Sequence, residues 1–154
     1  MRIRTIAVAV AVVAALATPA LAQNPVGVWK VNVAKSKYSP GPAPKSSTIT
    51  TTAVAGGFRA VNETVPATGA ATKSDVTYKF DGKDIKVTGN PNADTQAYAR
   101  VDDRHYTVTA KKGGKVMLTT KVEIAADGKS RTATQTGTDA QGKAVNNMIW
   151  YDKQ

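Results

Sequence analysis

Apolar and polar residues alternate with a period of two along most of the chain. In the first such segment Trp29, Val31 and Val33 share one face, and Lys30 and Asn32 share the other. The same alternation recurs in two later segments, 76–80 and 116–124. A period of two is the repeat of a β-strand with one buried and one solvated face. The pattern therefore predicts half-buried strands rather than helices.

Turn-forming residues separate the alternating segments. Asp81-Gly82 and Asp127-Gly128 are strong hairpin signals, because glycine accepts the positive φ that a tight hairpin turn needs. Strands joined so closely must be antiparallel, since a parallel return needs a crossover of a dozen or more residues. Ten strands are predicted, at 26–34, 46–54, 57–65, 72–80, 83–89, 95–102, 104–112, 115–125, 129–138 and 143–153.

A meander of this size protects its strand edges by closing on itself. We therefore expect an all-β fold, an antiparallel up-and-down meander that closes into a barrel of about 8–10 strands. Trp29 on the first strand and Trp150 on the last are then expected near the closure. The residue types agree, because Val, Thr, Tyr and Ile suit a pleated surface and Leu118 is the only leucine after residue 22.

One proline-rich segment, 38–45, interrupts the alternation. Its three prolines, Pro40, Pro42 and Pro44, remove backbone donors and favour extended geometry, so the segment cannot be a helix. We expect it to form a strap across one end of the barrel.

The first 22 residues have the pattern of a cleavable export signal. Arg2 and Arg4 precede an uncharged apolar stretch from Ile6 to Ala17, and Ala20-Leu21-Ala22 fits a signal peptidase site. The apolar stretch is shorter than the roughly 18 residues that a spanning helix needs. We expect cleavage after residue 22, a single domain over 23–154, no membrane-spanning segment after cleavage, and a monomer in the periplasm or secreted.

Charge and cysteine content exclude several classes of function. The chain has no cysteine, so neither a disulfide nor a thiolate metal site is expected. Loss of Arg2 and Arg4 with the signal lowers the net charge from +10 to +8. The lysines are spread along the chain, which is typical of a solvated surface. No nucleic-acid partner is expected, although a basic surface could adhere to anionic envelope polymers or to a protein partner.

The start of the first strand resembles a known family. Gly27-Val28-Trp29-Lys30, a Gly-x-Trp ahead of a β meander, is similar to the first signature of lipocalins. The run 27–45, with 89–94 and 137–139, also resembles small exported bacterial proteins of uncharacterised function that are described as lipocalin-like. The resemblance implies a calycin-type barrel, and it makes Arg131 the candidate for the lipocalin arginine that packs on the tryptophan.

The chain also departs from the calycin patterns that it resembles. Lipocalins have eight main strands and usually a C-terminal helix, whereas ten strands and no helix are predicted here. Fatty-acid-binding proteins have ten strands, but they insert two short helices after the first strand, where this chain has its prolines.

No catalytic or metal site is expected. His105 is the only histidine, it lies in the turn Asp102-Asp103-Arg104-His105, and the chain has no Gly-x-Ser-x-Gly element. The sequence predicts no cofactor and no enzyme activity.

The barrel interior is the remaining candidate for a functional site. Small Thr and Ala side chains could fill a narrow barrel or line a cavity in a wider one, and the sequence leaves both open. The shortage of Leu, Ile and Phe argues against a purely apolar pocket. We expect non-enzymatic binding of a small amphipathic or hydrophobic ligand, with candidate contacts Tyr78, Tyr98, Arg100, Arg131 and Trp150. The alternative is a protein-interaction module, for example a protease-inhibitor-like barrel without a small-molecule ligand.

Overall fold

Ten β-strands form the fold. The structure is a computed structural model that describes residues 24–154, so the predicted export signal lies outside the described residues. The strands are β1 (Gly27–Val31), β2 (Ser46–Val54), β3 (Gly57–Val65), β4 (Thr72–Tyr78), β5 (Asp81–Lys86), β6 (Thr95–Arg100), β7 (His105–Lys112), β8 (Lys115–Ile124), β9 (Ser130–Thr138) and β10 (Ala144–Lys153). Each corresponds to one of the predicted strands. In residues 24–154 no helix is long and apolar enough to cross a membrane.

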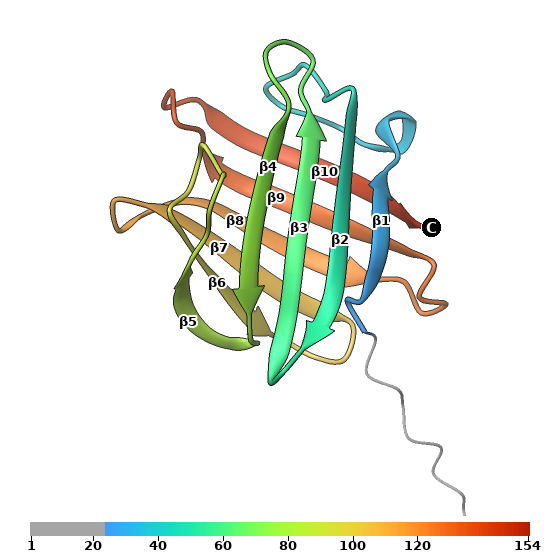
Figure 1. The fold of residues 1–154 in the computed structure, drawn as a ribbon. Helices are drawn as coiled ribbons and strands as arrows, with labels where there is room; N and C mark the ends of the chain where they lie inside the picture. Colours follow the sequence, from blue (N-terminus) through green and yellow to red (C-terminus); the bar gives the residue numbers. More distant parts are fainter. Residues whose placement is uncertain (1–23) are drawn as a thin grey trace, which may run out of the picture.

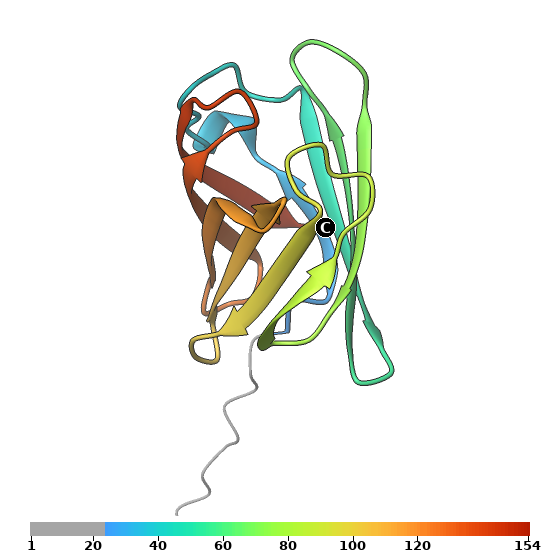
Figure 2. The same cartoon turned by 90° about the vertical axis from the view of Figure 1, so that its left-hand side faces the viewer.

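The strands make one antiparallel sheet that curls round until its first and last strands pair. The order is β4-β3-β2-β1-β10-β9-β8-β7-β6-β5. At the junction of the chain ends, Trp29 lies opposite Lys153 and Val31 opposite Tyr151. Figure 1 shows β1–β4 as one wall and β6–β10 as the wall behind it, and Figure 2 shows the two walls from the side. The predicted up-and-down barrel is confirmed.

The barrel is nearly closed between β4 and β5. These strands share no ladder, and one isolated bridge joins Asp75 to Thr88 through two backbone hydrogen bonds of 3.0 and 3.1 Å. Gly89 lies next to this bridge with φ +72°, and a Cβ there would come within 1.9 Å of the Lys73 carbonyl oxygen. The absence of a side chain at Gly89 therefore allows the two strands to approach each other.

The first strand ends earlier than predicted. β1 stops at Val31, and residues Val33–Lys35 form a 3-10 turn. The Asn32 side chain accepts a hydrogen bond from the Lys35 backbone amide at 3.2 Å, a local bond that competes with continuation of the strand. Val33 is consequently exposed, and the prediction that it shares the inner face of Trp29 is wrong.

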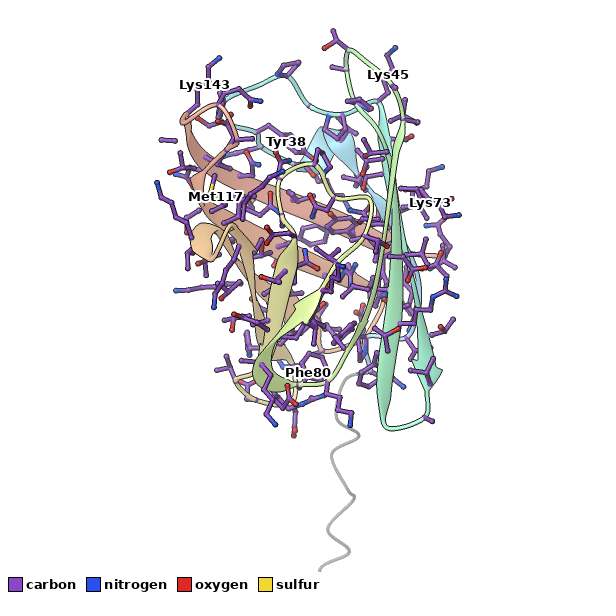
Figure 3. The ribbon with its side chains drawn as sticks, turned by 60° about the vertical axis from the view of Figure 1, so that its left-hand side comes forward. Tyr38, Lys45, Lys73, Phe80, Met117 and Lys143 are labelled. Atoms are coloured by element: carbon purple, nitrogen blue, oxygen red, sulfur yellow. The ribbon has the colours of Figure 1, made fainter. Side chains whose placement is uncertain are left out.

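The strap, residues 38–45, follows this turn and is held against β10. Lys37 and Met148 exchange two backbone hydrogen bonds of 2.7 and 2.9 Å. The backbone N–H of Asn146 donates to the Ser39 carbonyl oxygen at 2.7 Å. Figure 3 shows Tyr38 at this end of the barrel and Phe80 at the opposite end.

Aromatic side chains fill the end opposite the strap. Trp29 is fully buried, and its indole N–H donates to the Pro25 carbonyl at 2.8 Å. A chain of ring contacts, with centroids 3.8 to 5.6 Å apart, joins Phe58, Tyr78, Phe80, Tyr98 and Tyr106. Rings at these separations pack favourably and bury large apolar areas. This end is therefore the packed core of the barrel.

Candidate functional site

Two adjacent cavities occupy the barrel between the aromatic core and the strap. The upper cavity, of about 360 Å³, is lined by strap residues Tyr38 and Pro44 and by loop residues such as Asn92 and Asp139. The lower cavity, of about 150 Å³, extends toward the aromatic core. The two cavities share eight of their lining residues, namely Asn62, Ser74, Asn90, Gln96, Val108, Thr120, Gln135 and Tyr151. Of the two alternatives that the sequence left open, the structure has a cavity.

Arg131 lines the lower cavity and is 4% exposed. Its Nη1 donates to the Tyr106 hydroxyl at 3.2 Å. Its guanidinium carbon lies 4.6 Å from the centroid of the Trp29 ring and 5.0 Å from that of Tyr151. No ion pair among the described residues includes Arg131. A guanidinium carries five N–H donors, and the structure of residues 24–154 shows one hydrogen bond from Arg131 and no carboxylate within ion-pair distance of it.

The contact between Arg131 and Trp29 is the one that the lipocalin resemblance implies. β9 places Arg131 opposite Tyr151 of β10, and β10 in turn pairs with β1, which carries Trp29. Alternation along β9 points Arg131, Ala133 and Gln135 into the barrel, since all three line the lower cavity.

Neutral tyrosines surround the arginine. Tyr78 and Tyr98 are stacked with ring centroids 3.8 Å apart, and the Tyr98 hydroxyl donates to Gln96 Oε1 at 3.1 Å. Burial raises the pKa of Tyr78 and of Tyr98 far above the ordinary tyrosine value. Burial also raises the pKa of Tyr151 to about 12, although the charge of Arg131 opposes the shift. The hydroxyls therefore remain neutral near pH 7, and none supplies a counter-charge to Arg131.

Uncharged amides and hydroxyls line the upper cavity. Ser47 and Thr64 donate to Asn62 Oδ1 at 3.1 and 3.2 Å, and Asn147 Nδ2 donates to Gln135 Oε1 at 3.2 Å. All five residues line this cavity. The wall is thus suited to hydrogen bonding, in agreement with the expectation that the pocket would not be purely apolar.

Three of the five candidate contacts predicted from the sequence come together at the lower cavity, namely Tyr78, Tyr98 and Arg131. Arg100 and Trp150 line neither cavity. Arg100 is exposed, and its guanidinium lies 4.4 Å from the Phe80 ring centroid at the packed end. Whether any of the five contacts a ligand remains a prediction.

Trp150 lies on the outer side of β10. Its indole N–H donates to Asp152 Oδ1 at 2.8 Å, and Lys35 Nζ lies 5.0 Å from its ring centroid. The inward residues of β10 are Val145, Asn147, Ile149 and Tyr151, which line the cavities. Trp29 and Trp150 therefore belong to opposite faces of the closing strands, although those strands are neighbours.

Four amide residues that line the upper cavity were not predicted from the sequence, namely Asn62, Gln96, Gln135 and Asn147. A polar residue in an alternating strand is ordinarily assigned to the solvated face. The alternation does show which residues share a face, since Asn147 shares its face with Ile149 and Tyr151, and Gln135 shares its face with Arg131 and Ala133. It does not show which face of each strand points into the barrel.

His105 lies in a separate exposed cluster at the β6–β7 turn. Its Nδ1 is 2.7 Å from Asp102 Oδ1, and its Nε2 is 3.7 Å from Glu123 Oε1. Backbone hydrogen bonding from Arg104, together with His105, lowers the pKa of Asp102. His105 lines neither cavity. Within residues 24–154 no three histidine or acidic side chains are grouped so that they could hold a metal ion.

Comparison with known proteins supports the fold alone. No protein-family model matches the chain, and no curated protein sequence matches it. Among solved structures, it is similar to a Schistosoma mansoni fatty acid binding protein in complex with arachidonic acid. The match has a TM-score of 0.56 and 15% sequence identity, and it covers 88% of this chain and 97% of that one. The chain therefore has the fold of a ten-stranded antiparallel β-barrel that is similar to the barrel of this fatty acid binding protein.

Proposed function

We propose that the barrel binds a small amphipathic anion in its interior, with the acid group of the ligand on Arg131. The single observation that carries the proposal is the buried guanidinium of Arg131, which faces a cavity and forms no ion pair with any carboxylate of residues 24–154. The protein acts in this proposal as a binder and not as an enzyme.

Burial of the Arg131 charge costs free energy that a bound anion would offset. Removing an ion from water costs several kcal/mol even after the protein relaxes. The Tyr106 hydroxyl and the rings of Trp29 and Tyr151 offset part of that cost. A ligand carboxylate would offset it more strongly, because a carboxylate pairs with guanidinium through two parallel charge-assisted hydrogen bonds. The site therefore favours an anionic group over a neutral one.

The strap end offers the route of entry. The upper cavity extends to the strap and to the loops at this end, and the apolar members of its wall include Val108, Leu118 and Ile149. Figure 3 shows Lys45 and Lys143 at the same end. Surface cations of this kind raise the local concentration of an anionic ligand.

The fold similarity is compatible with such a ligand. The schistosome protein was solved with arachidonic acid, a carboxylic acid with an apolar chain. The export pattern of residues 1–22 supports the further proposal that binding takes place in the periplasm or outside the cell.

Titration calorimetry with decanoate tests the proposal. The protein is expressed from the full-length sequence in its own host and purified in the form that the host produces, with or without residues 1–22. Bound lipid is then removed. We compare wild type with Arg131→Met and with a matched control, Arg100→Met, which removes an arginine that lines neither cavity. Wild type and the control should bind decanoate. Arg131→Met should bind roughly tenfold to a hundredfold more weakly, the range for loss of a charged hydrogen-bond partner. Equal binding by all three, or no binding by wild type, would contradict the proposal.

A further inference from the structure

The strap fixes the orientation of an amide in the upper cavity. The backbone N–H of Ser39 donates to Asn147 Oδ1 at 2.9 Å. A backbone N–H can only donate, so the atom that it contacts must be the amide oxygen. The amide nitrogen of Asn147 must then point the other way.

Asn147 in turn fixes Gln135. Asn147 Nδ2 donates to Gln135 Oε1 at 3.2 Å. Because Asn147 Nδ2 is the donor in that contact, Gln135 must present its Oε1 to Asn147. The Nε2 group of Gln135 must then point elsewhere. Among the hydrogen bonds of the described residues, none uses Gln135 Nε2, and Gln135 lines both cavities. The cavity therefore contains an oriented amide donor.

This donor lies on the same strand face as Arg131. The two residues are four positions apart on β9, so their Cα atoms are about 13 Å apart along the strand. Ala133 lies between them on the strand, and all three residues line the lower cavity. One elongated molecule can therefore contact both residues.

From this arrangement we propose that the ligand carries an oxygen acceptor, such as an ester or ketone carbonyl, at a distance from its acid group, and that Gln135 selects for it. The inference rests on the proposed function, since it takes the acid group to be on Arg131. An unsubstituted hydrocarbon chain would exclude water from Gln135 Nε2 and offer no acceptor, which is unfavourable for a polar group. Gln135 is thus a specificity residue, and Asn147 is the residue that positions it.

Two probes of equal chain length and charge test the proposal: decanoate and monomethyl octanedioate. They have the same number of chain atoms and one carboxylate each, but only the ester adds a carbonyl acceptor. Calorimetry gives the ratio of their dissociation constants for wild type, Gln135→Glu and Asn147→Asp. In wild type the ester should bind roughly twofold to tenfold more tightly, the range for one neutral hydrogen bond.

The variants should change that ratio in defined ways. Gln135→Glu replaces the donor with an acceptor, so the preference for the ester should disappear. In Asn147→Asp the new carboxylate would still accept from Ser39 but could not donate to Gln135, so the Gln135 amide should turn and present its oxygen to the cavity. The preference should then disappear or reverse, although every side chain of β9 is unchanged. Thermal unfolding of each variant checks that it is folded, and the ratio cancels any uniform loss of affinity.

The outcomes separate this inference from the proposed function. If wild type binds both probes with equal affinity, or binds decanoate more tightly, the role of Gln135 is wrong while anion binding stands. If the preference is present but survives both substitutions, the inference is also wrong. If neither probe binds to wild type, the proposed function itself fails.

Discussion

The guanidinium of Arg131 on β9 lies over the ring of Trp29 on β1, 4.6 Å from the ring centroid, although β10 separates the two strands in the sheet. The inward curvature of the barrel brings these residues together. The contact joins the strand that starts the barrel to the strand that carries the buried cation. It therefore belongs both to the core and to the proposed site.

Replacing Arg131 should affect binding more than stability. One charged hydrogen bond contributes about 1.5 to 3 kcal/mol, and each cation–π contact about 0.5 to 2 kcal/mol. The desolvation cost of several kcal/mol opposes these gains. We predict that Arg131→Met changes the free energy of unfolding by less than about 2 kcal/mol, as measured by urea denaturation. A loss of more than about 4 kcal/mol would show that Arg131 is chiefly a structural element.

Alkaline pH should unfold the barrel through its tyrosines. Folding raises the pKa of Tyr78, Tyr98 and Tyr151 above the ordinary value of 10.0, in the last case to about 12. Below pH 10 both states hold these protons, and the contribution to stability is constant. Above it the unfolded chain loses them first, so the free energy of unfolding should fall by up to about 4 kcal/mol per pH unit for three groups.

Phenolate absorbance provides the measurement. In a titration between pH 9 and 12, ionisation of the buried tyrosines should coincide with loss of the β-sheet circular dichroism signal. Tyr78→Phe should reduce the dependence of stability on pH by up to about 1.4 kcal/mol per pH unit, since one of these groups is removed. Ionisation of all tyrosines near pH 10 with the fold intact would show that they are not buried as described.

The seam between β4 and β5 should depend on Gly89. An alanine there would have to adopt the left-handed φ of Gly89, and its Cβ would clash with the Lys73 carbonyl oxygen. We predict that Gly89→Ala lowers the free energy of unfolding by about 3 kcal/mol. Gly142→Ala is the matched control, because Gly142 has φ +81° and a Cβ added there would meet nothing within 4 Å, so it should cost about 1 kcal/mol. Amide exchange at Asp75 and Thr88 should accelerate in Gly89→Ala only. Equal costs for the two variants would mean that the seam does not require this close approach.

The strand order and most turns could be predicted from the sequence because both depend on local rules. Period-two alternation and Asp-Gly pairs are read within a few residues, and ten strands can close in few ways. The inward face of β10 could not be predicted in the same way. One face of β10 carries Met148 and Trp150, and the other carries Ile149 and Tyr151. Either face could belong to the core, and only the pairing of β10 with β1 and β9 decides between them. The polar lining of the cavity could not be predicted for the same reason, since a polar residue that faces a polar cavity gives the same alternation as one that faces the solvent.

Processing of the N-terminus offers an independent prediction. If residues 1–22 are an export signal, mass spectrometry of the protein recovered from its host should find Gln23 as the first residue. Substituting Ala22 with a bulky charged residue should block cleavage. A mature protein that retains Met1 would contradict the proposed export.

The most direct measurement of the central claim is side-chain NMR of the barrel interior during titration with monomethyl octanedioate. If an anion binds on Arg131, the Nε–H resonance of Arg131 and the Nε2 resonances of Gln135 should shift together and saturate, while the Nε–H resonance of Arg100 stays in place. Shifts confined to surface lysines or to Arg100, with the Arg131 and Gln135 signals unchanged, would contradict it.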